Sequence, residues 1–181
     1  MSKDPLDLKK FIRTVDNFPI DGIAFRDITS LIETPEAFVK TCDELTKIAR
    51  DFGADIVASI ESRGFIFAGT IARDLNLPFV LARKPGKLPN ETYKKSFDLE
   101  YGSTSIEIQK NTEIKHKQKI VIVDDLVATG GTAIACSEIF TENFNVKSEN
   151  ILILSIIDLP ELGGSRLISE KGYLIETLID Y

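Results

Sequence analysis

The chain has few of the side chains that usually bind metals or form disulfides. It contains two cysteines and one histidine among 181 residues. Cys42 and Cys136 lie far apart, with no CxxC pair and no second histidine, so neither a zinc site nor a disulfide framework is indicated. His116 lies in the lysine-rich stretch 115–119, where a solvated loop histidine is the simpler interpretation. Acid–base chemistry would therefore depend on carboxylates or a tyrosine.

Long apolar segments are also missing. The longest apolar run, 151–157, is far shorter than the roughly 20 residues that span a bilayer. Residues 1–10 are charged and lack the apolar core of a signal peptide. We therefore expect a soluble, cytoplasmic protein. The length predicts one domain, 1–181.

An excess of positive charge, which general nucleic-acid binding requires, is absent as well. The net charge is −6, so the chain repels polyanions at long range. Positive charge is concentrated in residues 83–95, where five basic residues accompany one acidic residue. Residues 83–97 also contain two prolines and a glycine, which predicts a long loop. Loops of this length in a compact domain are usually functional, although a merely solvated loop is the alternative.

The hydrophobic pattern predicts strands that alternate with helices. The expected helices are 6–15, 35–51, 65–75 and 133–144, and the expected core strands are 56–60, 79–82, 120–123 and 151–157. Residues 17–28 read as an irregular arm, and 97–101 with 105–109 as two short antiparallel strands. The fold class is therefore α/β, with a mainly parallel twisted sheet flanked by helices. Its ligand site is expected at the carboxyl ends of the strands.

One segment carries most of the functional information, residues 120–133, Ile-Val-Ile-Val-Asp-Asp-Leu-Val-Ala-Thr-Gly-Gly-Thr-Ala. An apolar strand runs into Asp124 and Asp125, and a small-residue turn then opens a helix. Free backbone N–H groups and the positive end of the helix dipole would converge there, which suits a phosphate. The two carboxylates would repel a phosphate, but they suit the vicinal hydroxyls of a ribose or a divalent cation.

Other phosphate-binding motifs fit this segment poorly. A P-loop needs a lysine after the second glycine, and none follows Gly131. A dinucleotide fingerprint needs three spaced glycines, whereas only the Gly130-Gly131 pair is present. A plain strand–turn–helix, with glycines that only permit tight packing, is the remaining alternative.

The 120–133 segment resembles the phosphoribosyl-pyrophosphate (PRPP) loop of the type I phosphoribosyltransferases. Four further segments occur in the family's order and spacing: 18–29 (FPIDGIAFRDIT), 61–65 (ESRGF), 82–89 (ARKPGKLP) and 99–102 (LEYG). The resemblance covers about Leu8 to Leu159. The PRPP loop alone identifies only the superfamily, and residues 25–27 with 100–102 narrow it to the members that use adenine.

The resemblance implies a role in purine salvage. The 5-phosphoribosyl group of PRPP would be transferred to N9 of adenine, giving AMP and pyrophosphate, with Mg²⁺ carried by PRPP near Asp124 and Asp125 and no metal bound by the protein alone. It also implies the type I phosphoribosyltransferase fold, an N-terminal hood at about 1–30 over the base, and a mobile catalytic loop at 83–97. Family members are dimers, so a homodimer is expected.

The resemblance further implies which residues form the site. The catalytic group is Glu100, Arg63 and Lys84. The groups that bind PRPP or AMP are Asp124, Asp125, Ala128, Thr129, Gly130, Gly131, Thr132, Ser62, Arg83, Lys87 and Tyr101. The adenine contacts are Ile23, Ala24, Phe25, Arg26 and Leu159. Arg83 and Lys87 could act in their own or in the partner subunit, and the group that protonates N7 of adenine stays open.

Two other functions are compatible with parts of the pattern. A 6-oxopurine phosphoribosyltransferase would need a lysine or arginine that addresses the exocyclic oxygen, and none is clearly placed. A non-catalytic regulator that senses PRPP would keep the loop at 124–132 but need a nucleic-acid surface, which an acidic chain of this length does not offer.

Overall fold

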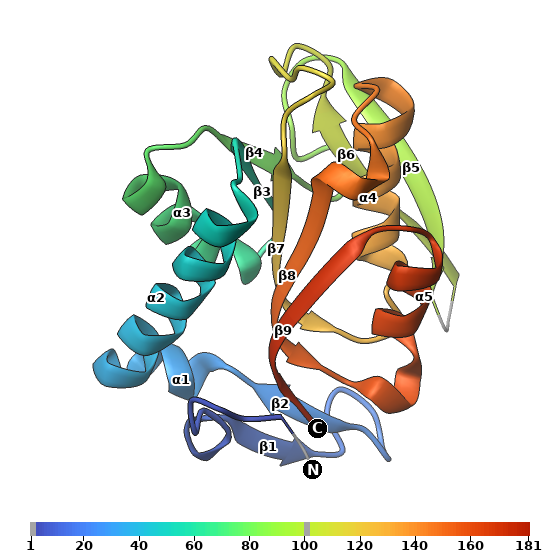
Figure 1. Cartoon of the computed structure of the whole chain (residues 1–181). Coiled ribbons are helices and arrows are strands. Elements are labelled where there is room, and N and C mark those ends of the chain that lie inside the picture. The colour runs from blue at the N-terminus through green and yellow to red at the C-terminus, as the bar shows by residue number, and fades with distance from the viewer. Residues whose placement is uncertain (1–2, 100–101) are drawn as a thin grey trace.

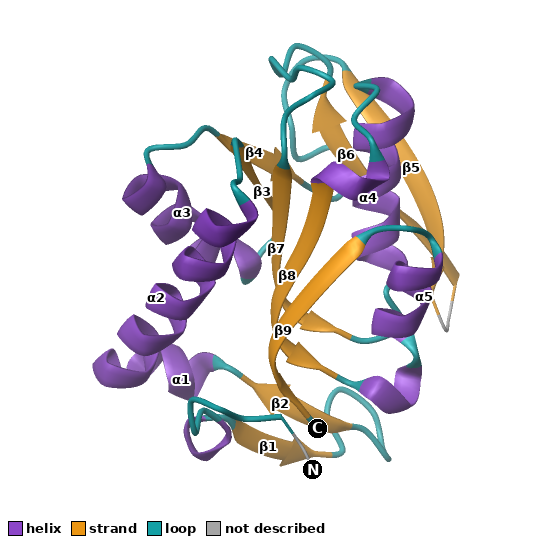
Figure 2. Cartoon of the chain, in the orientation of Figure 1, coloured by secondary structure: helices purple, strands orange, loops and turns teal. Residues whose placement is uncertain are grey.

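A parallel sheet of five strands forms the centre of the molecule in the computed structural model, which describes residues 3–99 and 102–181. The strand order is β4-β3-β7-β8-β9 (Figures 1 and 2). These strands are β3 (Ile56–Ile60), β4 (Phe79–Ala82), β7 (Ile120–Val127), β8 (Ile151–Asp158) and β9 (Leu174–Asp180). All residues of β3 and β8 are buried, because helices cover both faces of the sheet. The predicted α/β class is confirmed.

The helices form one layer on each side of the sheet (Figure 2). On one side lie α2 (Pro35–Phe52) and α3 (Gly64–Leu75), and on the other α4 (Gly131–Asn143) and α5 (Gly164–Glu170). Helix α2 begins with proline in its first turn and is followed directly by Gly53, which has a φ of 76°. Proline at the start and glycine just past the end are the usual helix boundaries, and the predicted helix at 35–51 is confirmed.

The N-terminal segment differs from its prediction. The expected helix at 6–15 is wrong, because this stretch forms a single 3-10 turn, η1 (Lys9–Phe11), followed by strand β1 (Arg13–Asp16). Strand β1 pairs antiparallel with β2 (Ala24–Asp27), and helix α1 (Thr29–Glu33) follows. Leu8 and Ile12 are still buried, so the apolar spacing indicated burial correctly. Tertiary pairing with β2 overrode the weak helical preference. Figure 1 shows this hairpin beside the carboxyl ends of β7 and β8.

A second antiparallel hairpin packs beside α4 (Figure 1). It consists of β5 (Thr92–Leu99) and β6 (Gly102–Gln109). The predicted loop at 83–97 is therefore shorter, because strand pairing already begins at Thr92. Lys95 holds the hairpin to α4 through Glu138, at 3.0 Å, and Glu142, at 2.6 Å. The predicted site residues Glu100 and Tyr101 lie outside the described residues.

Several elements extend past what the sequence pattern indicated. Strand β7 continues to Val127 instead of ending at Val123, so the two aspartates lie within the strand. Helix α5, strand β9 and the short turns η2 (Ser148–Asn150) and η3 (Pro160–Leu162) were not predicted. Within 3–99 and 102–181, no helix combines the length and the hydropathy needed to cross a membrane.

Candidate active site

The turn between β7 and α4 forms a concave cradle of backbone groups. Gly130 precedes the helix with a φ of 80°, a left-handed conformation that glycine adopts without strain. Asp124 and residues 126–133 line a small cavity of about 90 Å³ at this helix start. The predicted turn at 128–132 therefore has the shape and the helix-end polarity of an anion site.

A close backbone contact supports the cradle from behind. The N–H of Gly164 donates to the carbonyl of Ala128 at 3.1 Å. A Cβ atom added to Gly164 would lie 2.2 Å from that same carbonyl oxygen, and one added to Gly130 would lie 2.9 Å from the carbonyl of Gly164. Only glycine at both positions allows this approach. Gly164 was not among the predicted site residues, although the Gly163-Gly164 pair was a possible signal.

The two aspartates differ in their surroundings. Asp125 is 5% exposed, and its Oδ2 lies 2.7 Å from Nε of Arg63. Asp124 is half-buried, and its Oδ1 accepts a hydrogen bond from the N–H of Asp125 at 2.9 Å. Burial, and then the charge of Asp125, raise the pKa of Asp124 well above its usual value. The pair therefore offers one carboxylate held by a cation and one whose ionisation is opposed.

The turn after β3 faces these aspartates. The Glu61–Ser62 peptide is cis, and α3 begins shortly afterwards at Gly64. A Cβ on Gly64 would lie 2.7 Å from the carbonyl of Val123 and 2.6 Å from Oγ of Ser59. The absence of a side chain thus lets this turn approach the end of β7, which brings Arg63 to Asp125.

A larger cavity of about 290 Å³ lies between this turn, the aspartates and the β5–β6 hairpin. Its lining contains the charged residues Glu61, Arg63, Lys84, Asp124 and Asp125 together with Ile60, Phe97, Thr104, Ser105, Ile106, Leu126 and Thr132. The structure thus brings Lys84 and Arg63 to one space with the aspartate pair and Thr132. The two cations and the aspartate pair can there hold a ligand that carries both negative charge and hydroxyl groups.

Arg83 and Lys87 are the other two cations that were predicted to bind PRPP. Arg83 donates from Nε to Oε2 of Glu61 at 2.7 Å and from Nη1 to the carbonyl of Lys87 at 3.0 Å. Neither Arg83 nor Lys87 lines the larger cavity. The N–H of Gly86 donates to Oε2 of the buried Glu107 at 3.3 Å. Glu61 and Glu107 therefore hold the basic loop beside Lys84, a role that the sequence analysis did not assign.

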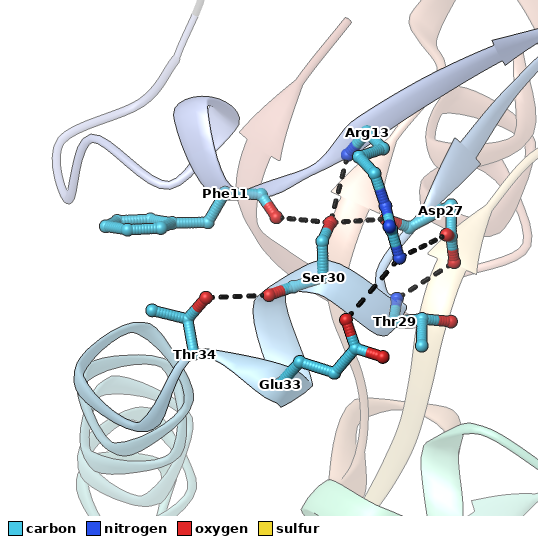
Figure 3. Close-up of polar contacts among 7 residues, drawn as sticks. All are labelled: Phe11, Arg13, Asp27, Thr29, Ser30, Glu33 and Thr34. Atoms are coloured by element: carbon cyan, nitrogen blue, oxygen red, sulfur yellow. Dashed lines mark hydrogen bonds and ion pairs between the residues drawn. The ribbon is translucent and has the colours of Figure 1, made fainter.

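A polar network attaches the β1–β2 hairpin to α1 (Figure 3). Oγ of Ser30 donates to the carbonyl of Phe11 at 2.7 Å and accepts from the N–H of Arg13 at 3.2 Å. Asp27 accepts from the N–H of Thr29 at 2.9 Å and lies 3.3 Å from Nη2 of Arg13. The start of the domain is thus held in a defined position at the carboxyl edge of the sheet.

The predicted adenine contacts divide between this hairpin and the end of β8. Ile23 and Ala24 are exposed, whereas Phe25 and Arg26 are half-buried. The guanidinium of Arg63 lies 5.3 Å from the centre of the Phe25 ring, which links the hairpin to the turn after β3. The N–H of Leu159 donates to the carbonyl of Val127 at 3.0 Å. Phe25 and Leu159 thus contact residues that line the two cavities, although none of the five predicted adenine contacts lines the larger cavity itself.

Comparisons with known proteins agree with this geometry. Residues 29–163 match the family model for the phosphoribosyl transferase domain. An adenine phosphoribosyltransferase of Erythrobacter litoralis is 43% identical over 175 residues, covering 97% of this chain and 96% of that protein. The crystal structure of the Thermoanaerobacter pseudethanolicus adenine phosphoribosyltransferase superposes with a TM-score of 0.86 at 39% identity, covering 97% of this chain and 98% of that one.

A third relative was crystallised with a ligand. The Giardia lamblia enzyme, complexed with 9-deazaadenine, matches with a TM-score of 0.86 at 35% identity, covering 97% of this chain and 96% of that one. The fold predicted from the resemblance is thus confirmed at full length. From the matching domain model and from relatives that align over nearly all of both chains, we conclude that this chain belongs to the adenine phosphoribosyltransferase family.

Proposed function

We propose that the chain transfers the 5-phosphoribosyl group of PRPP to N9 of adenine, giving AMP and pyrophosphate in purine salvage. The main support is the shared space around Asp124, Asp125, Arg63 and Lys84, next to the glycine cradle at the start of α4. The cradle would hold the 5′-phosphate, the carboxylates the ribose hydroxyls, and the two cations the pyrophosphate. This arrangement matches the three parts of PRPP.

The reaction at C1′ needs little covalent help from the protein. As the bond between C1′ and the pyrophosphate oxygen breaks, its electron pair leaves with pyrophosphate and the sugar gains oxocarbenium character. N9 of adenine then bonds to C1′, and the base releases its imidazole-ring proton to water or to the departing pyrophosphate. Arg63 and Lys84 would stabilise the charge that builds on pyrophosphate, and the aspartates would fix the ribose. Glu100 is proposed to hydrogen-bond N7 as N9 attacks.

The donor set fits a magnesium ion that arrives with the substrate. Mg²⁺ prefers six oxygen ligands in octahedral geometry and commonly uses substrate phosphates and water. In residues 3–99 and 102–181 no group of three or more histidine, cysteine, aspartate or glutamate side chains could hold a metal. Asp124 and Asp125 supply carboxylate oxygens beside the cavity. When bound, the ion would offset negative charge on pyrophosphate.

A homodimer is part of the proposal. Large apolar side chains are exposed on α2, α3 and β4, namely Val39, Ile66 and Leu81, and they could pack against a second copy. Arg83 and Lys87 would act in the same or in the partner subunit. The cytoplasmic location expected from the sequence stays a prediction.

The substrate assignment is tested by incubating the purified chain with PRPP, Mg²⁺ and each purine base in turn. We expect AMP and pyrophosphate from adenine, and much slower turnover of hypoxanthine or guanine. Faster turnover of a 6-oxopurine would show that the chain is a 6-oxopurine phosphoribosyltransferase instead. PRPP binding without pyrophosphate release from any base would instead favour the regulator.

A further inference from the structure

Tyr181 lies against a residue of the N-terminal hairpin from the other end of the chain. Cζ of Arg26 lies 4.0 Å from the centre of the Tyr181 ring. Figure 1 shows the C-terminal end of β9 beside the β1–β2 hairpin. A guanidinium this close to an aromatic face gains electrostatic and stacking energy. Tyr181, which directly follows β9, therefore holds the side chain of Arg26, a residue of the segment proposed to bind the base.

Tyr181 also contacts the opposite border of the proposed base site. Its N–H donates to the carbonyl of Asp158 at 3.1 Å. That carbonyl belongs to the same peptide group as the N–H of Leu159, which donates to Val127 at 3.0 Å. Tyr181 and Leu159 pack against the same apolar cluster. One residue thus joins the hairpin to the peptide that positions Leu159.

Arg26 has few other contacts that would orient it. Its Nη1 donates to Oγ1 of Thr14, the residue opposite it in the hairpin. Its Nε is buried and has no hydrogen-bond partner among the described residues. The long arginine side chain therefore depends on the ring face of Tyr181 and on one hydroxyl. Loss of the ring would free several rotatable bonds.

A second cation provides an internal comparison. Nζ of Lys9 lies 4.7 Å from the centre of the same ring, but Lys9 belongs to η1 and not to the base segment. Burial raises the pKa of the Tyr181 hydroxyl, an effect that the charge of Arg26 opposes. The ring therefore stays neutral near pH 7 and presents its face to both cations.

We infer that Tyr181 is a positioning residue for purine recognition, which acts by holding Arg26 and the peptide before Leu159 in place. This inference rests on the proposed function. The PRPP cradle lies at the start of α4. It meets these contacts only through the carbonyl of Val127, which accepts from Leu159 and not from Tyr181. Removal of the Tyr181 ring should therefore weaken base binding and leave PRPP binding nearly unchanged.

The test compares Tyr181→Leu, Tyr181→Phe and the matched control Lys9→Met. For each, the KM of adenine is measured at saturating PRPP, and the KM of PRPP at saturating adenine. We expect Tyr181→Leu to raise the KM of adenine about fivefold or more, the scale of one cation–π contact, with the KM of PRPP changed less than about twofold. Tyr181→Phe keeps the ring face and should restore the low KM, and Lys9→Met should behave as the wild type.

Equal increases of both KM values in Tyr181→Leu would show a general structural role and overturn the inference. So would a Tyr181→Phe variant as impaired as Tyr181→Leu. If the leucine variant does not fold, Tyr181→Met supplies the same test with a larger side chain. The comparison can be made with whichever purine the wild type uses. If the base assignment is wrong, the wild type itself will use a purine other than adenine. If the inference about Tyr181 is wrong, the Tyr181 variants will show no selective increase in the KM of the preferred purine. The two failures are therefore distinguishable.

Discussion

Nε of Arg63 lies 2.7 Å from Oδ2 of Asp125. This ion pair joins the turn after β3, on the proposed pyrophosphate side, to the end of β7, on the proposed ribose side. Because Asp125 is buried, its charge is costly without a partner. In the proposed complex each partner has a substrate group available, a ribose hydroxyl for Asp125 and a pyrophosphate oxygen for Arg63.

Replacing both aspartates with asparagine should remove the ribose contacts. We expect Asp124→Asn combined with Asp125→Asn to lower kcat/KM for PRPP by roughly hundreds-fold, since fixation of the ribose and the charge next to the metal are lost together. Steady-state kinetics at varied PRPP measure this. Asp51→Asn, an exposed substitution on α2, is the control. Unchanged kinetics of the double variant would contradict the proposed ribose contacts.

The raised pKa of Asp124 predicts a pH-dependent stability. Burial raises this pKa above its ordinary value of 3.8, so between 3.8 and the folded pKa the folded protein keeps a proton that the unfolded chain has lost. The corresponding stabilisation is complete below the unfolded pKa and is lost as pH rises through the folded pKa. We expect Asp124→Asn to melt about 2–4 °C above the wild type near neutral pH.

Calorimetry across the range from about pH 4 to pH 8 checks this prediction. The difference in melting temperature should shrink toward the acidic end, where the folded carboxyl is neutral and the unfolded carboxyl is increasingly protonated. A difference that stays constant with pH would show that ionisation of Asp124 is not responsible.

Gly164 should be intolerant of any side chain. A Cβ would lie 2.2 Å from the carbonyl of Ala128, so Gly164→Ala must displace the cradle. We expect a loss of about 1–3 kcal/mol in the free energy of unfolding, together with an increased KM for PRPP. In the control Gly69→Ala, the new Cβ meets no atom within 4 Å, and the free energy should stay the same or rise. Equal behaviour of the two variants would rule out the packing argument.

Glu61 should affect turnover because it holds the basic loop in position. Its carboxylate holds Arg83 at 2.7 Å, beside Lys84. We expect Glu61→Gln to lower kcat about tenfold with little change in the KM of adenine, because a misplaced cation stabilises the leaving group less well. Glu149→Gln, which breaks the exposed pair with Lys147, is the control and should have no effect. A selective loss of adenine affinity would argue against this role.

Glu100 is the remaining catalytic candidate. Removal of a group that assists the reacting base should depress turnover far more than ground-state binding. We therefore expect Glu100→Ala to lower kcat strongly while the dissociation constant of adenine, measured by calorimetric titration, changes little. A pure binding defect would remove Glu100 from the catalytic group.

The sequence predicted the central sheet well because buried parallel strands have a simple signature. The runs at 56–60 and 151–157 are mostly apolar, with one serine each, and rich in β-branched residues, and both form buried strands. The cradle at 128–132 could also be predicted, because two aspartates directly precede its small residues and glycines. Arg63, Lys84 and the aspartates were predicted to lie together, and they line one cavity.

Features that depend on long-range partners could not be predicted. Residues 6–15 have helical spacing, but pairing with residues 24–27 decides their structure. The importance of Gly164 appears only when α5 is placed against the turn at Ala128. Tyr181 is 155 positions from Arg26 in the chain, and no local pattern relates an aromatic residue to an arginine at that separation.

Lys95 joins the β5–β6 hairpin to α4 through Glu138 and Glu142. Ile106 and Ile108 of the same hairpin are in the core. The hairpin and the helix are therefore packed as one unit at this point. Because the same helix begins at the cradle, a displacement of the hairpin would also displace the backbone groups proposed to hold the 5′-phosphate.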